Sequence, residues 1–493
     1  MRAEYQVGII GAGFGGLIAA LRLKSAGCTS FVIFERAPEV GGVWRDNVYP
    51  GCACDIQSHL YSIEGHPNPS WTSSFAGQPE ILQYLKDVAR RNDLQRHIRH
   101  DVNVLDATFA ERDGCWDIHD QKGGTCRVRS VILATGPHSR PLSPSFKGQG
   151  SFQGRMFHSS AWDRSLALDG KRVAVIGTGA SAAQIIPNIA PIAARLFVFQ
   201  RTAAWILPRG NRKIGPLQHR MFRRAPWTQA IARTLIYWFL EFIGLAFFGN
   251  ALVNRWLTGI ALRKLRREVH DPSTRAKLTP SYTIGCKRIL LADDFYPAFN
   301  RTNVELVTEN IEEILPNHVR TSDGRDVAVD VIVLATGFIV ADTDGYLRVS
   351  GKDGRSLADD WDRDEAEAYL GINVAGYPNM ALLLGPNSGL AHSSALHVME
   401  SQMTYILRYL QAVEAAGENG YVDVDPDVQK NYAMKLRRRL VKTVWAAGCK
   451  SWYLDRHGRN TTIYPGLTNE YRRRTSAFDE SAYVVVHGHR DVV

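Results

Sequence analysis

Two residues of opposite charge stand at the same distance from two glycine-rich segments. Glu35 lies 24 residues after Gly11, and Arg201 lies 24 residues after Gly177. A carboxylate at that position accepts hydrogen bonds from a ribose hydroxyl and repels a 2′-phosphate, whereas a guanidinium binds such a phosphate in a bidentate manner. The spacing therefore predicts two dinucleotide sites, the first for FAD and the second for NADPH. The alternative interpretation of Arg201 is an exposed residue at a strand end.

The first segment has the pattern of a dinucleotide-binding turn. Apolar runs at residues 6–10 and 30–34 are predicted strands, with a helix predicted over 17–27. Its glycines are Gly11, Gly13 and Gly16. They permit a tight turn, close approach of a pyrophosphate to the backbone and close packing of helix on strand. The N-terminus of the helix then offers unpaired N–H groups to the phosphates.

The second segment repeats this order of elements. Strands are predicted at 171–176 and 196–201 on either side of a helix. The turn holds Gly177, Gly179 and Ser181, and Ala182 replaces the third glycine, which the motif permits. We therefore expect Gly177, Gly179 and Ser181 on the NADPH side.

Two further apolar runs lie at residues 131–136 and 330–338. Each contains Ala-Thr-Gly at the end of its predicted strand. Small residues at a strand end let the chain leave one domain for the next beside a bound nucleotide. We expect these runs to mark the crossings between the two folds.

Three segments resemble the motifs of type I Baeyer-Villiger monooxygenases, which are class B flavoprotein monooxygenases. Residues 41–55 match the family's GGxWxxxxYPGxxxD element, and residues 152–163 match its FxGxxxHxxxW fingerprint. Residues 285–288, Gly-Cys-Lys-Arg, look like the segment that carries the family's active-site arginine. The fingerprint residues are Phe152, Gly154, His158 and Trp162.

The resemblance implies an α/β fold with two Rossmann-like dinucleotide-binding domains and a helical insertion. The FAD-binding domain is expected at 1–140 and 339–493, and the NADPH-binding domain at 141–208 and 285–338. The helical subdomain is expected at 209–284, which is rich in Arg, Leu, Ala and Trp and nearly free of strand alternation.

The resemblance also implies an activity, in which one oxygen atom from O₂ is inserted into a ketone or aldehyde through a C4a-peroxyflavin. The product is an ester or a lactone. Arg288 would stabilise the peroxide anion, because a guanidinium stays charged at any working pH. Asp55 would pair with Arg288 and hold it in position. The alternatives are a structural ion pair for Arg288 and a turn residue for Asp55.

The other motif residues have expected positions. Arg201, Thr202 and Lys287 would bind the 2′-phosphate of NADPH. Gly42, Trp44 and Asp55 belong to the FAD side, and Trp44 and Trp452 either line the site or serve as packing.

In the resembling family the fingerprint lies on a linker between domains. His158 is therefore expected to organise domain motion, and the alternative is a hydrogen-bonded structural histidine.

Two other enzyme classes combine the same cofactors. A flavin-containing monooxygenase that oxygenates S or N uses the same intermediate, but Asp55 and Arg288 favour an anion and hence carbonyl substrates. A disulfide reductase would use Cys52 and Cys54, but a one-residue gap strains such a disulfide ring.

Composition limits the partners and the compartment. The chain has 493 residues and a net charge of +10, but its arginine runs at 437–439 and 472–474 have helix-like surroundings, so no nucleic-acid partner is predicted. Seven cysteines are scattered rather than arrayed as a disulfide framework, which favours a reducing, cytoplasmic location.

No metal site is predicted. A small hydrophobic ketone or aldehyde is the expected substrate, and the oligomeric state is open.

The most apolar stretch, residues 234–248, is shorter than the roughly 18 to 20 residues that a membrane span needs, and it contains Glu241. We expect a buried or channel-lining helix here. The alternative is a peripheral membrane contact, supported by the flanking Arg223, Arg224, Arg233 and Arg255. Such a contact would also suit a membrane electron-transfer protein.

Overall fold

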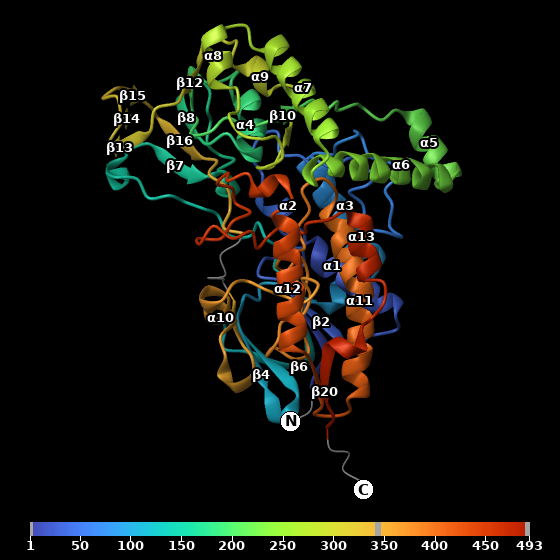
Figure 1. Ribbon diagram of the computed structural model, residues 1–493. Coiled ribbons are helices and arrows are strands. Elements are labelled where there is room, and N and C mark those ends of the chain that lie inside the picture. The colour runs from blue at the N-terminus through green and yellow to red at the C-terminus, as the bar shows by residue number, and fades with distance from the viewer. Residues whose placement is uncertain (1–2, 341–346, 489–493) are drawn as a thin grey trace.

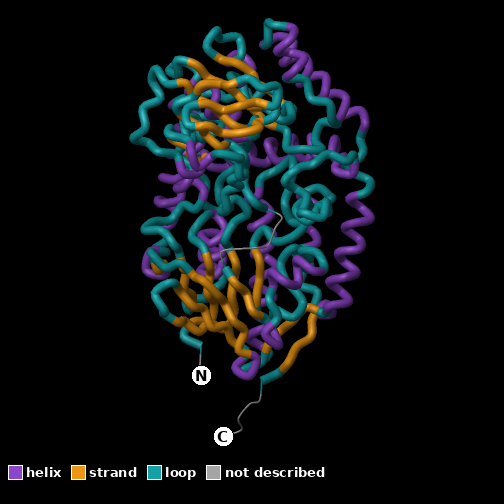
Figure 2. The backbone as a smooth tube through the Cα atoms, turned by 90° about the vertical axis from the view of Figure 1, so that its left-hand side faces the viewer, coloured by secondary structure: helices purple, strands orange, loops and turns teal. Residues whose placement is uncertain are grey.

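The computed structural model describes residues 3–340 and 347–488. Two sheets lie at opposite ends of the molecule, and loops and helices fill the space between them (Figure 2). The described chain begins and ends near the larger of the two sheets.

The larger sheet has eight strands in the order β17-β4-β5-β6-β1-β2-β3, with β18 beside β6. Its strands are β1 (Tyr5–Ile10), β2 (Phe31–Phe34), β3 (Ile98–Arg99), β4 (Val104–Ala110), β5 (Cys115–Asp120), β6 (Thr125–Leu133), β17 (Arg348–Ser350) and β18 (Met380–Leu382). Strand β1 pairs in parallel with both β2 and β6. All four residues of β2 are buried, as expected for a parallel strand covered on both faces.

Helices from both ends of the sequence pack beside this sheet. They are α1 (Phe14–Ser25), α2 (Val43–Asp46), α3 (Gln78–Arg91), α10 (Leu357–Arg363), α11 (Ala395–Ala415), α12 (Pro426–Leu440) and α13 (Thr468–Arg474). Figure 1 shows α11, α12 and α13, from the C-terminal part of the chain, beside α1. A hairpin of β19 (Tyr421–Val424) and β20 (Tyr483–Val486) completes this end.

The smaller sheet is entirely parallel, in the order β12-β9-β8-β16-β7. It contains β7 (Arg155–His158), β8 (Arg172–Ile176), β9 (Arg195–Phe199), β12 (Val304–Val307) and β16 (Val331–Leu334). Helix α4 (Ala180–Ile189) connects β8 to β9. A three-stranded antiparallel sheet adjoins it, with β13 (Ile311–Leu315), β14 (His318–Thr321) and β15 (Asp326–Ala328).

A helical segment leaves the smaller sheet and returns to it. It holds α5 (Pro216–Arg224), α6 (Pro226–Gly244), α7 (Ala251–Glu268) and α8 (Pro272–Lys277), and α9 (Phe295–Ala298) follows. The two ends of the segment are joined by the short parallel pair β10 (Ile206–Leu207) and β11 (Leu290–Leu291).

The expectation at 234–248 was a buried or channel-lining helix, and the expectation of burial is wrong. These residues belong to a longer helical stretch, 226–247, which has the length and composition of a membrane span, and 22% of its most apolar window is buried. Helix α6 is instead exposed along one side, because its inward face is occupied by polar residues described below.

Candidate functional site

The first glycine-rich turn joins the C-terminal end of β1, a central strand of the larger sheet, to α1. Gly11 has φ +105°, and a Cβ atom there would lie 2.6 Å from the carbonyl oxygen of Ala134. A Cβ atom at Gly16 would overlap the carbonyl oxygen of Gly11. Glycine is therefore required for the tight turn and for the packing of α1. Gly13 precedes the first residue of α1, whose N-terminal N–H groups lie at the turn.

Glu35 follows β2 and lies beside this turn, with 3% of its surface exposed. Its Oε2 accepts a hydrogen bond from Ala12 N at 2.9 Å. Its Oε1 accepts from Ala37 N at 3.0 Å and from Arg45 Nη1 at 2.9 Å. Because each carboxylate oxygen can accept more than one hydrogen bond, Oε2 retains capacity for a ribose hydroxyl. This held carboxylate fits an FAD site.

A second segment closes over the turn through backbone contact. Gly42 has φ +53°, and a Cβ atom there would lie 3.1 Å from Gly13 Cα. Two residues later, Trp44 is buried and its Nε1 donates to Tyr61 Oη at 3.0 Å. The absence of side chains at Gly13 and Gly42 lets the two backbones approach each other closely, and Trp44 is anchored by Tyr61.

The second glycine-rich turn repeats the geometry of the first. Gly177 has φ +112°, and a Cβ atom there would lie 2.5 Å from the carbonyl oxygen of Ala335. Ala134 and Ala335 each begin an Ala-Thr-Gly sequence. A Cβ atom at Gly179 would meet nothing within 4 Å, so the approach to α4 is open above the turn. Ser181 lies in the first turn of α4.

Positive charge gathers beside the second turn. Arg201 is exposed and follows β9, and Thr178 Oγ1 donates to the carbonyl oxygen of Thr202 at 3.1 Å. The ammonium group of Lys287 lies 5.0 Å from the ring centroid of Tyr282. Burial lowers the pKa of Lys287, and the charge of Arg201 lowers it further. Two cations close enough to repel each other fit an anionic group such as a 2′-phosphate.

Asp55 and Arg288 form an ion pair between the FAD-side segment and the end of the helical segment. Asp55 Oδ2 accepts from Arg288 Nε at 3.0 Å and from Nη2 at 2.5 Å. Their side chains are 28% and 30% exposed. Burial raises the pKa of Asp55, but the charge of Arg288 and the hydrogen bonds to the carboxylate together outweigh burial, so the net pKa lies below the ordinary value. The carboxylate of Asp55 in turn raises the pKa of Arg288, which keeps the guanidinium charged.

Two residues near this pair were missed by the sequence analysis. Tyr453 is buried, and its hydroxyl has no hydrogen-bond partner among the described residues. Burial raises the pKa of Tyr453 to about 12, against the opposing charge of Arg288. The other is His138, an exposed residue that lies close enough to interact electrostatically with Arg288 and Asp55.

Trp452 connects these two residues. Its ring centroid lies 4.4 Å from that of Tyr453 and 5.5 Å from that of His138. The only sequence signals for them were weak, namely adjacency to Trp452 and to the Ala-Thr-Gly at 134–136.

The fingerprint residues gather at the edge of the smaller sheet. A Cβ atom at Gly154 would overlap the carbonyl oxygen of Asp330 and lie 2.6 Å from the ring of Phe152. His158 Nε2 lies 2.9 Å from the carbonyl oxygen of Gly337, and its Nδ1 lies 2.8 Å from Ser160 Oγ. Trp162 packs edge-to-face on Phe157. His158 thus contacts the second crossing run, and these hydrogen bonds suit a structural histidine as well as an organiser of domain motion.

The segment that follows the first crossing run lies beside the end of the second. Pro141 and Phe338 form an antiparallel bridge, and Leu142 N donates to the carbonyl oxygen of Gly337 at 2.9 Å. The chain therefore passes between the two sheets along two adjacent strands of backbone.

A further contact between the two sites involves Gln184 of α4, which the sequence analysis did not identify. Its Oε1 accepts from Tyr49 Oη at 3.1 Å, and its Nε2 donates to the carbonyl oxygen of Ala53 at 2.9 Å. A Cβ atom at Gly51 would lie 2.7 Å from the carbonyl oxygen of Gln184. The helix of the second glycine-rich turn therefore docks on the segment that ends in Asp55.

The cysteines give no support to dithiol chemistry at Cys52 and Cys54. Both are free and buried, and burial raises the pKa of Cys52 to about 11. The structure instead pairs Cys286 with Cys449 as a disulfide, with Cα atoms 6.3 Å apart. The position of this pair next to Lys287 could not be inferred from the scattered spacing of the cysteines.

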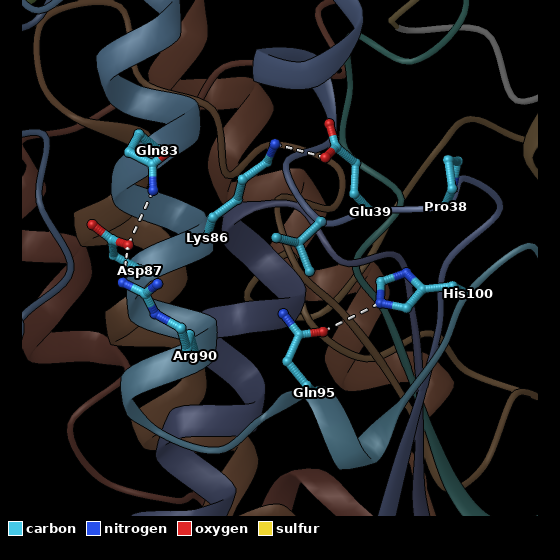
Figure 3. A pocket seen from close by; sticks show the side chains of 9 residues that line it. Pro38, Glu39, Gln83, Lys86, Asp87, Arg90, Gln95 and His100 are labelled. Atoms are coloured by element: carbon cyan, nitrogen blue, oxygen red, sulfur yellow. Dashed lines mark hydrogen bonds and ion pairs between the residues drawn. The ribbon is translucent and has the colours of Figure 1, made fainter.

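A separate hollow lies between α3 and the loop after β2 (Figure 3). Its charged residues are paired with one another, Lys86 with Glu39 at 2.6 Å and Arg90 with Asp87 at 2.7 Å. None of the residues that line it belongs to the glycine-rich turns or to the Asp55–Arg288 pair. Among the described residues, no group of three or more His, Cys, Asp or Glu side chains is placed to hold a metal ion.

Comparison with known proteins identifies the family. The flavin-binding monooxygenase-like family matches residues 4–342. The chain is 43% identical to a Baeyer-Villiger monooxygenase of Streptomyces coelicolor, over 98% of this chain and 92% of that protein. It is also 43% identical to one of Pseudomonas aeruginosa, over 97% and 91% of the two chains.

Solved structures give the same result. The crystal structure of OTEMO in complex with FAD and NADP has a TM-score of 0.89 and 28% sequence identity, covering 99% of this chain and all of that one. The fold class predicted from the sequence is thereby confirmed. The chain belongs to the flavin-binding monooxygenase-like family, as its resemblance to Baeyer-Villiger monooxygenases predicted.

Proposed function

We propose that this chain is an FAD-containing, NADPH-dependent monooxygenase that inserts one oxygen atom from O₂ into a small hydrophobic ketone or aldehyde. The observation that carries the proposal is the Asp55–Arg288 pair, which fixes a permanent cation where the FAD-side segment meets the end of the helical segment. An S- or N-oxygenating enzyme has no need of such a cation, because its oxidant is a neutral hydroperoxide. The names of the relatives and the cofactors of the related structure support the same conclusion.

FAD would be held by Gly11, Gly13, Gly16 and Gly42, whose bare backbone lets the pyrophosphate approach, and by Glu35 at its ribose. Bound FAD supplies the reduced ring that activates O₂. The chain contributes the electrostatic environment in which negative charge on oxygen is stabilised.

Arg288 would stabilise that charge directly. The Nε–H of Arg288 and one N–H of Nη2 donate to Asp55. Both N–H groups of Nη1 therefore remain available to the reacting oxygen. Asp55 would act as a positioning residue, because two hydrogen bonds to one oxygen fix the plane of the guanidinium. Tyr453 and Trp452 would close the apolar side of the site.

NADPH would lie over Gly177, Gly179 and Ser181, with its 2′-phosphate on Arg201, Thr202 and Lys287. The open approach above Gly179 and the mutual repulsion of Lys287 and Arg201 support this placement. Phe152, Gly154, His158 and Trp162 would connect that domain to the crossing runs, where a change in the contact between His158 and Gly337 can accompany domain motion.

We propose the domain boundaries that the sequence predicted, with FAD binding at 1–140 and 339–493, NADPH binding at 141–208 and 285–338, and helices at 209–284. The composition of the sheets supports them, since every strand of the larger sheet lies between 5 and 133 or between 348 and 382. A cytoplasmic location is part of the same proposal.

The deciding experiment supplies purified holoenzyme with NADPH, ¹⁸O₂ and a panel of hydrophobic ketones, aldehydes and sulfides. Mass spectrometry should find one ¹⁸O atom in an ester or lactone, and the carbonyl substrates should be converted faster than the sulfides. Conversion of sulfides alone would move the chain to the S-oxygenating class. Consumption of NADPH with peroxide as the sole product from every compound would contradict the proposal.

A further inference from the structure

Helix α6 turns its apolar side away from the protein. Six large hydrophobic residues of this helix are exposed, and Trp227 and Leu235 are each 66% exposed. The six are Trp227, Ile231, Leu235, Trp238, Phe239 and Phe242. Their spacing of three and four residues places them along one side of the helix. A core helix would have this side buried.

The opposite side of α6 is polar and is fixed to the protein. Gln229 is buried and donates to the carbonyl oxygen of Asn68 at 2.8 Å. Arg233 donates to the carbonyl oxygen of Ser62 at 2.6 Å. Rotation of α6 to bury its apolar side would leave these groups without partners.

Glu241 anchors the same side near the end of the helix. It is buried, and it accepts from Thr468 N and from Asn469 N, each at 3.1 Å. His392 Nε2 also lies 3.1 Å from Glu241 Oε1. Because these polar residues are held inside, one side of α6 is packed on the protein, and the helix does not form an independent span.

The neighbouring helices extend the apolar surface. Leu217 and Met221 of α5 and Leu252 and Trp256 of α7 are exposed, and the rings of Phe242 and Trp256 are in contact. Ten of the 18 large hydrophobic residues exposed in the described part of the chain fall between 217 and 256. Figure 1 shows α5 and the first part of α6 projecting from the side of the molecule. A clustered exposed surface of this kind marks a binding face.

The charge around this surface is positive. Residues 212–256 contain seven basic residues and one acidic residue, Glu241, which is buried and paired. The exposed basic residues include Arg220, Arg223 and Arg224 on α5 and Arg255 on α7. Exposed tryptophan and leucine beside arginine are characteristic of helices that lie in a membrane interface, and arginine attracts anionic lipid. A second copy of this chain would bring the same positive charges together.

We propose that the exposed residues of α5, α6 and α7 bind the surface of an anionic lipid bilayer. The apolar side of α6 enters the interface, and the arginines of α5 and α7 contact lipid phosphates. The end of α6 leads towards the candidate active site, because the chain continues to the buried Phe247, which packs against Gly285 and the ring of Trp445. Membrane binding does not depend on the proposed oxygenation, and the two are measured separately.

The test is flotation of the holoenzyme with vesicles of phosphatidylcholine, with and without phosphatidylglycerol, at low and high salt. The enzyme should float with the anionic vesicles at low salt, less with the neutral ones, and less at high salt. Leu235→Glu should weaken partition by about tenfold to a hundredfold, since burial of a leucine side chain is lost. NADPH oxidation by this variant in solution should equal that of the wild type, which shows that the fold is retained.

Val484→Glu is the matched control, because Val484 is 48% exposed and lies on β20, at the opposite end of the molecule from α6 (Figure 1). It should float like the wild type. Absence of flotation with anionic vesicles at low salt, or equal loss in both variants, would overturn the proposal. If the wild type is a dimer that Leu235→Glu dissociates and neither protein floats, the surface serves self-association instead and the proposal is wrong.

Discussion

Asp55 and Arg288 are separated by 233 residues in the sequence, yet one carboxylate oxygen of Asp55 accepts two hydrogen bonds from the Arg288 guanidinium. The pair joins the segment that follows the first glycine-rich turn to the segment that ends the helical insertion. The two hydrogen bonds fix the orientation of the Arg288 guanidinium. The first prediction below tests its charge and the second tests its orientation.

Arg288→Ala should separate NADPH oxidation from oxygen insertion. The variant should oxidise NADPH but release hydrogen peroxide, with ester formation reduced by about a hundredfold or more, because the charge-stabilising donor is gone. Ester and peroxide are measured in the same reaction. Ester formation at the wild-type rate would remove Arg288 from the proposed site.

Asp55→Asn preserves the shape of the side chain and removes its charge. We expect ester-forming kcat/KM to fall by about tenfold or more, with a higher ratio of peroxide to ester, because the guanidinium is no longer fixed. A purely structural role would lower thermal stability and leave this ratio unchanged. Asp55→Glu, which restores the charge, should recover part of the ester yield.

Arg201→Ala should alter the choice between NADPH and NADH. Loss of a charged hydrogen bond to the 2′-phosphate should raise KM for NADPH by about tenfold to a hundredfold and leave KM for NADH nearly unchanged. Arg195→Ala, at the other end of β9, is the control and should affect neither. Equal increases for both cofactors in Arg201→Ala would contradict the assignment.

Gly51→Ala should weaken the docking of α4 on the segment before Asp55. Its Cβ atom would approach the carbonyl oxygen of Gln184, and its φ of +78° is unfavourable for alanine. Gly65→Ala shares this backbone cost, with φ +80°, but its Cβ atom would meet nothing within 4 Å. The Tm of Gly51→Ala should therefore be lower than that of Gly65→Ala, and its KM for NADPH higher. Equal Tm values would show that the contact is unimportant.

Glu470 should contribute stability that is lost in acid. Burial opposes its ionisation, but Arg439 and Arg474 outweigh this and lower the pKa of Glu470 from 4.5 to about 2. Since the folded pKa is depressed, the stabilisation is complete above about pH 4.5 and is lost as the pH falls towards 2. The difference in unfolding free energy between wild type and Glu470→Gln should be largest near pH 7 and shrink below pH 4.5. Denaturant titrations of both proteins at a series of pH values check this, and a difference that is the same at every pH would contradict it.

The local motifs were accessible from the sequence because each lies within one short stretch of the chain. Gly11 and Gly177 are required by a positive φ, and Glu35 and Arg201 follow strands whose length fixes their position beside each turn. The family resemblance supplied the pairing of Asp55 with Arg288, which spacing alone could not give.

Contacts between distant segments were decided by the tertiary structure. Gln184, Tyr453 and His138 occupy no motif, and they reach the candidate site only because α4, the C-terminal region and the first crossing run meet there. The disulfide of Cys286 and Cys449 likewise joins residues 163 positions apart.

Helix α6 is the clearest case in which the sequence did not predict how an element packs. Its sequence predicted a buried helix, because apolar residues usually face a core. Tertiary packing instead buried Gln229, Arg233 and Glu241, for which the protein offers hydrogen-bond partners, and left the apolar side outward. Sequence determines which residues a helix presents on each side, whereas the partners available in the folded chain determine which side faces inward.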